Sequence, residues 1–76
     1  MPKSTPQLTI INRLNVFRAE ERITQEQLAN AVGVTRATIV AIERGNYNPS
    51  LELAFRIARH FKADINSIFS VEEEIK

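Results

Sequence analysis

The sequence predicts an all-α domain of five short helices, and three observations lead to this fold class. Helix-capping and helix-stop residues recur at short intervals, apolar residues repeat at helical spacing, and the connecting segments are only a few residues long. The chain has 76 residues, which is room for one domain. Because so short a domain buries only about 60% of its unfolded surface, its core must be thin.

The composition excludes several classes of protein. The chain has no Cys, so neither a disulfide nor a thiolate zinc site can hold the fold together. Its 43% hydrophobic and 25% charged residues are ordinary globular values, which argues against disorder. No apolar run is long enough for a membrane span, and residues 1–6 lack the apolar stretch of a signal peptide. A cytoplasmic protein is therefore expected.

The two ends of the chain differ from its centre. Residues 1–7 contain two prolines and are expected to form a flexible arm. Residues 8–70 form the predicted domain, and residues 71–76 form an acidic tail. Residues 8–11 are rich in β-branched side chains and fit either a strand or the lead-in to a helix.

An amphipathic helix is expected over residues 12–21, where Leu14 and Phe17 recur at helical spacing. A second helix begins after Thr24, because Thr24 and Gln27 have the three-residue spacing of a capping box. The inward face of this second helix consists of Leu28, Ala29 and Val32.

The third helix follows after a very short connection. Gly33 ends the second helix, since the residue just past a helix often needs a positive φ, and Thr35 is the expected N-cap of the next. Ile39 and Ile42 form the inward face of the third helix, and Gly45 ends it. Two helices joined by about three residues around a glycine are typical of a helix-turn-helix.

Two further helices complete the predicted domain. Residues 46–49 form a turn, because the residue before a proline avoids helical backbone. Ser50 caps the fourth helix and Asp64 caps the fifth. The apolar residues are Leu53, Ala54, Ile57, Ala58 and Phe61 in the fourth helix and Ile65, Ile68 and Phe69 in the fifth.

Residues 24–50, TQEQLANAVGVTRATIVAIERGNYNPS, resemble the small single-domain helix-turn-helix regulators of the Cro/CI type, and the resemblance covers about residues 11–70. Ala29 lies where the two helices approach closely, Gly33 lies in the turn, and two isoleucines face the core. The resemblance implies a five-helix Cro/CI repressor-like domain that binds double-stranded DNA and regulates transcription, most simply as a repressor.

The resemblance also implies a role for each outward position of the motif. The recognition helix, residues 35–44, would enter the major groove, and Gln25 at the start of the preceding helix would bond a phosphate. Arg18 and Glu43 match a pair that in the family forms an internal ion pair, so both are assigned to structure. The residues predicted to contact DNA are Gln25, Thr35, Arg36, Ala37, Thr38, Val40, Ala41, Arg44, Asn46 and Tyr47.

One departure from the family bears on sequence reading. Positions 37 and 40 often carry Gln and Ser in the family, whereas this chain has Ala37 and Val40, followed by Ala41. Arg36 is then the one long polar side chain at the start of the recognition helix. It is expected to pair with a guanine, worth about 1–3 kcal/mol of discrimination, while the small apolar residues contact thymine methyl groups.

Other interpretations of the same residues stay open. Arg36 and Arg44 also fit ordinary solvated charges, and Tyr47 also fits packing over the turn. The apolar outward side chains and the acidic tail suit a protein-interaction module of the same fold, such as an antitoxin that masks a toxin. An enzyme is not expected, nor any metal or cofactor, because the chain has one His and no phosphate-binding glycine loop. His60 is assigned to packing or to the helix dipole.

A homodimer is expected, because one such domain reads only a few base pairs. The contact between the two protomers would place their recognition helices about 34 Å apart, on the half-sites of a palindromic operator. Residues 8–11 and 69–72 further fit a short two-stranded β ribbon of the kind that some small family members form. The predicted two-fold interface consists of Ile65, Ile68, Phe69 and Val71, with Ile75 as a further candidate.

The formal net charge of +1 is small for a protein that binds nucleic acid. Residues 71–76 carry three Glu and one Lys, a net −2, so residues 1–70 carry +3 from nine Lys and Arg and six Asp and Glu. The balance is still modest, which predicts a shallow dependence of DNA affinity on salt.

Overall fold

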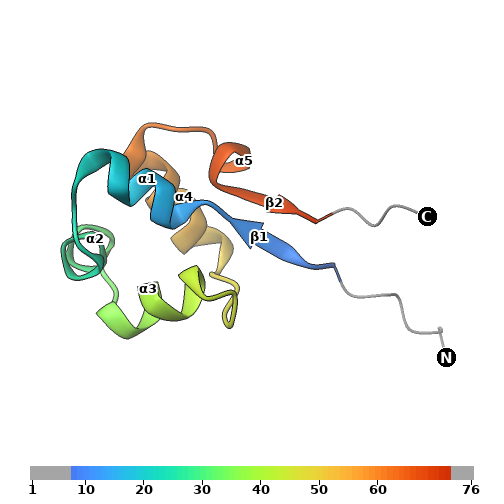
Figure 1. Cartoon of the computed structure of the whole chain (residues 1–76), viewed down its shortest axis with the longest axis horizontal. Helices are drawn as coiled ribbons and strands as arrows, with labels where there is room; N and C mark the ends of the chain where they lie inside the picture. The colour runs from blue at the N-terminus through green and yellow to red at the C-terminus, as the bar shows by residue number, and fades with distance from the viewer. Residues whose placement is uncertain (1–7, 73–76) are drawn as a thin grey trace, which may run out of the picture.

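The computed structural model describes residues 8–72 as five helices and one two-stranded sheet (Figure 1). The elements in chain order are β1 (Ile10–Asn12), α1 (Leu14–Glu21), α2 (Gln25–Val32), α3 (Arg36–Glu43), α4 (Leu51–Phe61), α5 (Ile65–Ile68) and β2 (Phe69–Val71). The predicted five-helix fold with a terminal ribbon is confirmed. The predicted arm, residues 1–7, and residues 73–76 of the predicted tail lie outside the described residues.

Side-chain caps begin the three central helices. The Thr24 hydroxyl accepts a hydrogen bond from the Gln27 amide at 3.0 Å, and the Gln27 side-chain oxygen accepts one from the Thr24 amide at 2.8 Å. The predicted capping box of α2 is therefore confirmed. Thr35 and Ser50 cap α3 and α4, each accepting from the amide three residues further on. Each cap stabilises its helix by about 1 kcal/mol.

The first and last helices begin differently from the expectation. Helix α1 starts at Leu14 rather than at Asn12, because Asn12 belongs to β1 and its side-chain oxygen accepts from the Leu14 amide at 3.1 Å. Asp64 does occupy the N-cap position of α5, but its side chain makes no capping hydrogen bond. The sequence therefore predicted the approximate starts of α1 and α5, but not the hydrogen bonds made there.

Glycines with a positive φ follow α2 and α3, at Gly33 and Gly45, whereas α1 and α4 end at residues that have side chains. Helix α2 ends at Gly33, whose φ of +81° lies in the left-handed region as expected. Helices α1 and α4 end at Arg22 and Lys62, with φ of 59° and 54°. A residue with a Cβ in this region carries a strain of about 1 kcal/mol, which glycine would avoid.

The ribbon is formed by β1 and β2, which pair antiparallel and extend from the helical body beside α1 and α5 (Figure 1). Ile10 pairs with Val71, Ile11 with Ser70 and Asn12 with Phe69. The Glu72 amide also donates to the Thr9 carbonyl at 2.8 Å, so the pairing continues past both strands. Sequence signals placed this strand at residues 8–11, whereas it spans Ile10–Asn12.

The core is shared by all five helices. Its largest fully buried side chains are Leu14, Leu28, Ile39, Ile42, Ile57 and Ile68. The rings of Phe17 and Phe61 add a tilted aromatic contact between α1 and α4, with centroids 5.5 Å apart. Helix α3 therefore rests on a continuous apolar base, and its other side lies along one edge of the molecule (Figure 1).

Candidate nucleic-acid interface

The turn between α2 and α3 is fixed by backbone bonds and by packing. The amides of Gly33 and Val34 both donate to the Ala29 carbonyl, at 2.9 and 3.0 Å. Val34 packs against the core, which fixes the direction in which the chain enters α3. Since Ile39 and Ile42 are buried, the opposite side of α3 faces solvent. The two helices thus form the rigid pair that a helix-turn-helix requires.

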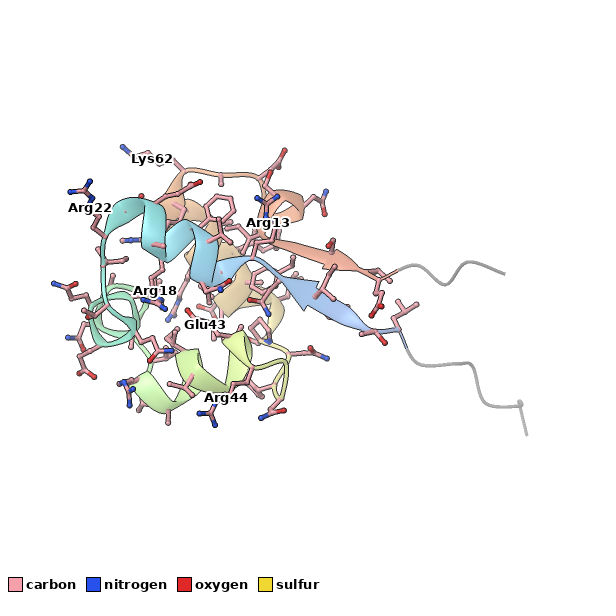
Figure 2. All side chains as sticks on the ribbon, viewed as in Figure 1. Arg13, Arg18, Arg22, Glu43, Arg44 and Lys62 are labelled. Carbon is pink, nitrogen blue, oxygen red and sulfur yellow. The ribbon has the colours of Figure 1, made fainter. Side chains whose placement is uncertain are left out.

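The outward side of α3 carries most of the predicted DNA contacts. Arg36 and Ala37 are exposed at its start, and Figure 2 shows Arg44 directed away from the body at its end. Thr38 is half-buried, and its hydroxyl lies 3.1 Å from that of Thr35. Val40 and Ala41 are also half-buried. The accessible surface of α3 is therefore an apolar strip between two arginines.

The loop after α3 extends this surface. Asn46 and Tyr47 are exposed, and Tyr47 is 46% accessible, so about half of its surface is open to solvent. The Asn46 amide donates to the Ala41 carbonyl at 2.9 Å, which ties the loop to α3. Both residues are thus open to solvent just beyond the end of α3.

Arg18 of α1 and Glu43 of α3 are brought together behind the recognition helix (Figure 2). Their bidentate contact measures 2.7 Å from Nε to Oε2 and 3.2 Å from Nη2 to Oε1. Arg18 Nη1 also donates to the Ile23 carbonyl at 3.0 Å. The hydrogen bond with Glu43 raises the pKa of the Arg18 guanidinium above its ordinary value. This pair fixes the C-terminal end of α3 against α1.

Gln25 has a partner that the sequence did not indicate. Its Nε2 donates to Glu43 Oε1 at 3.0 Å, so the side chain joins the ion pair. The side-chain amide keeps a second N–H donor beyond the one bound to Glu43, and the phosphate role of Gln25 stays a prediction. The sequence could not show the contact, because it depends on how the start of α2 meets the end of α3.

A basic hollow beside the start of α2 was missed by sequence reasoning. It has a volume of about 520 Å³, and Arg22 and Arg36 lie on its rim. Arg22 follows α1, outside the motif, so only its charge and its closeness to the motif in the sequence could have drawn attention. Glu26 also lines the hollow, so Arg22 and Arg36 are the cations that it offers to an anionic backbone beside one carboxylate.

Comparison with known proteins decides the family. A helix-turn-helix family model matches residues 16–68. The chain belongs to the helix-turn-helix family. An uncharacterized helix-turn-helix transcriptional regulator of Archaeoglobus fulgidus is 56% identical to it over 62 residues, which cover 82% of this chain and 87% of that protein. The resemblance to Cro/CI-type regulators is thereby confirmed at the level of the family.

More distant relatives of this helix-turn-helix protein agree with the assignment. The immunity repressor protein of Bacillus phage phi105 is 33% identical over 69 residues, which cover 91% of this chain and 48% of the repressor. The crystal structure of a candidate DNA-binding protein from Bacteroides fragilis has a TM-score of 0.73 at 26% identity and covers 80% of this chain and 98% of its own. These relatives are named as regulators or binding proteins rather than as enzymes, in agreement with the expectation of a non-catalytic protein.

The predicted dimer surface of the helix-turn-helix protein needs one correction. Ile68 is only 1% exposed and belongs to the protomer's own core, so it cannot meet a partner. Ile65 and Phe69 are half-buried, and Val71 is exposed. Ile75 lies outside the described residues. Ile68 is the buried residue of the four-residue helix α5, and it belongs to the same core cluster as Ile57 and Phe61 of α4.

Exposed apolar side chains of α4 extend the remaining surface. Leu51 is 71% and Phe55 49% exposed. Leu51, but not Phe55, lines a shallow apolar hollow of about 320 Å³. The hollow is lined by Ile10, Asn48, Pro49, Leu51, Ala54, Ile65 and Phe69. We call Leu51, Phe55, Ile65, Phe69 and Val71 the apolar face.

Other polar groups of the described chain play structural parts. His60 stacks edge-on against Phe61 with ring centroids 4.8 Å apart, and its Nε2 lies 3.5 Å from Glu21 Oε1. Within residues 8–72, no three His, Asp or Glu side chains gather as they would around a metal ion. No helix in the same range is long and apolar enough to cross a bilayer.

Proposed function

We propose that this helix-turn-helix protein is a sequence-specific transcription regulator that binds a palindromic operator as a homodimer. It represses by occluding a promoter, without any chemical step. The exposed side of α3, held from behind by the core and by the Arg18–Glu43 pair, is the observation that supports this function. A fixed helix with one free side is what major-groove recognition needs.

In this proposal α3 lies in the major groove, which is about 12 Å wide. Arg36 reads a guanine through its two parallel donors. Ala37, Val40 and Ala41 offer only methyl groups and contact thymine methyls beside that guanine. The side chains of Val40 and Ala41 have no donor or acceptor, so only apolar contact is open to them at these positions.

Contacts with the DNA backbone flank the recognition helix on both sides. Arg44, Asn46 and Tyr47 approach one strand from the end of α3, while Arg22 and the amides of α2 approach the other. Because few cations take part, the affinity falls less steeply with salt than that of a strongly basic protein.

The apolar face supplies the homodimer contact. A two-fold axis through it sets the two α3 helices on successive half-sites, about 34 Å apart. Burying Leu51 and Phe55 removes from water the large side chains that the protomer leaves exposed on α4. The dimer surface thus combines α4 with α5 and β2, and not only the segment after residue 64.

The test is to select bound sequences from random DNA and then compare Arg36→Ala with a matched control. Arg36→Ala should weaken operator binding by about 1–3 kcal/mol and relax one base position. Arg59→Ala removes an exposed charge from α4 and should leave that preference unchanged. Equal losses on operator and random DNA for Arg36→Ala would defeat the base-reading role, and a wild-type protein without sequence preference would defeat the function.

The apolar strip on α3 favours a second candidate, a protein-interaction module such as an antitoxin that masks a toxin. Ala37, Val40 and Ala41 would then contact a protein surface. Salt distinguishes the two, because binding to phosphates weakens as salt rises while an apolar protein contact does not. Antitoxins can also bind their own promoters, so a protein partner and an operator are compatible.

A further inference from the structure

Asn12 makes contacts that link distant parts of the domain. Its Nδ2 donates to the Ile42 carbonyl at 2.9 Å, across 30 residues of sequence. Its Oδ1 accepts from the Leu14 amide, and its backbone pairs with Phe69 in the ribbon. The side chain is half-buried, so water competes only in part for these bonds. One small residue therefore touches the end of α3, the start of α1 and the strand β2.

The Ile42 carbonyl lies in the last turn of α3, where carbonyls have no partner within the helix. The Gly45 amide donates to it at 3.0 Å, and Asn12 supplies the second donor. The next residue, Glu43, is held by Arg18 from α1. The C-terminal end of α3 is thus held at neighbouring residues by two separate elements, β1 and α1.

We propose that Asn12 is a positioning residue, which ties the orientation of the recognition helix α3 to the ribbon and through it to the apolar face. Its ribbon partner, Phe69, lines the hollow of that face. A second copy that docks on the apolar face holds Phe69 and the strand beside it, and Asn12 carries this constraint to Ile42. By linkage, DNA that orders the end of α3 strengthens the dimer by the same factor.

The consequence for DNA binding rests on the proposed function, but the contact between ribbon and helix does not. Dimerisation alone would raise the affinity for the operator, because two recognition helices of one dimer bind two half-sites of one DNA. The Asn12 contact contributes to affinity in a different way, because it makes the orientation of α3 in each protomer depend on the ribbon. Losing it should leave the dimer formed and its reading helix less well placed.

The substitution Asn12→Asp separates the two side-chain bonds of Asn12. An aspartate keeps the oxygen that accepts from the Leu14 amide, and its charge suits the start of α1. It replaces the donor to Ile42 by a second oxygen, which faces a carbonyl oxygen. Asn15→Asp is the matched control, because Asn15 is exposed in the first turn of α1 and the charge change is the same.

Amide exchange measured by NMR on the free protein tests the contact itself. In Asn12→Asp, exchange at Gly45 and Asn46 should rise about tenfold relative to wild type, with Leu28 in α2 unchanged. Asn15→Asp should leave all these amides as in wild type. Unchanged exchange at Gly45 and Asn46 in Asn12→Asp overturns the proposal, whatever the DNA results.

Binding to the selected operator and to random DNA tests the functional part. Asn12→Asp should lose about tenfold more operator affinity than Asn15→Asp, while the two variants lose random-DNA affinity equally. Equal operator losses in the two variants would assign the effect to charge and overturn the coupling. A wild-type protein with no preferred sequence defeats the proposed function instead, and the exchange result still decides the role of Asn12.

A second variant covers the case in which Asn12→Asp does not fold. Asn12→Ser keeps a hydroxyl that can accept from the Leu14 amide, but it is too short to reach the Ile42 carbonyl. It should reproduce the faster exchange at Gly45 and Asn46 and the loss of operator preference without any change of charge. Wild-type exchange and operator affinity in Asn12→Ser overturn the proposal.

Discussion

The helix-turn-helix and the ribbon of this domain depend on different kinds of contact. Helices α2 and α3 begin at their own caps, Thr24 and Thr35, and their turn is closed by local bonds to Ala29. The ribbon has strands of three residues each, and it is joined to the body by bonds between residues far apart in the chain. The helix-turn-helix is started by local contacts and then held by the Arg18–Glu43 pair, whereas the ribbon depends on contacts between distant residues throughout.

The two regions also present different surfaces. The outward side of α3 carries Arg36 and Arg44 around small apolar residues, while the apolar face carries the large side chains Leu51 and Phe55. We therefore expect binding at α3 to respond to salt and association at the apolar face to respond to the loss of buried area. The following substitutions test this division, beginning with the largest expected effect.

Ile68→Ala tests whether this residue of α5 belongs to the core or to a partner surface. We expect a loss of about 2–5 kcal/mol in the free energy of unfolding, because the side chain is fully buried and its removal leaves a cavity. Urea denaturation at several protein concentrations measures it. A smaller loss of stability that grows only when the protein is diluted would mean that Ile68 lies in the dimer interface.

Arg18→Ala tests the polar support of the recognition helix. The substitution leaves Glu43, 10% exposed, without its cation, so we expect to lose about 3 kcal/mol of stability. Because the hydrogen bond with Glu43 raises the pKa of Arg18, its contribution is fully present at neutral and mildly alkaline pH and is lost only as the pH rises through the raised pKa. Denaturation should thus give the same difference from wild type at pH 7 and pH 10, and a difference that shrinks by pH 10 would contradict it.

Phe55→Ser tests the apolar face. Removing this half-exposed ring should weaken dimerisation by about 2 kcal/mol, roughly thirtyfold in Kd, with little change in protomer stability. Val16→Ser is the control, since Val16 is 37% exposed and lies on α1, which contributes no residue to the apolar face. Sedimentation equilibrium measures the dimer dissociation constant of each variant. Equal effects of the two substitutions would mean that the apolar face is not the dimer contact.

Lys62→Gly tests the strain at the end of α4 and has the smallest expected effect. Glycine takes up the left-handed backbone at this position without a clash, so stability should rise by up to about 1 kcal/mol. Thermal unfolding should show a midpoint a few degrees higher. A lower midpoint would show that the Lys62 side chain stabilises the helix end by more than the strain costs.

The contrast between the two regions explains what the sequence could predict. The capping box at Thr24, the stop at Gly33 and the stripe of α4 follow from neighbouring residues, and the structure contains all of them. Ile68, by contrast, has the same apolar character whether it faces the core or a partner. Only the packing of α5 decides between the two, and periodicity over four residues cannot show that packing.

The same limit applies within the candidate site. The resemblance to Cro/CI-type regulators placed Arg36 and Arg44 on the outward side of one helix, and both are exposed. The bond of Gln25 to Glu43, and that of Asn12 to Ile42, join residues 18 and 30 positions apart, and no local pattern indicates them. Leu51 and Phe55 lie in the same predicted helix as the core residues, but their exposure depends on what α5 and β2 leave uncovered.

The ribbon would allow the order of the elements along the chain to be changed. Because the Glu72 amide is bonded to the Thr9 carbonyl, the beginning and the end of the described chain lie side by side. A short loop could join them, and the exposed turn before Pro49 could be opened instead, which would give a circular permutant with every helix intact. In such a permutant the recognition helix would be close to a free terminus, while the ribbon would become an ordinary hairpin.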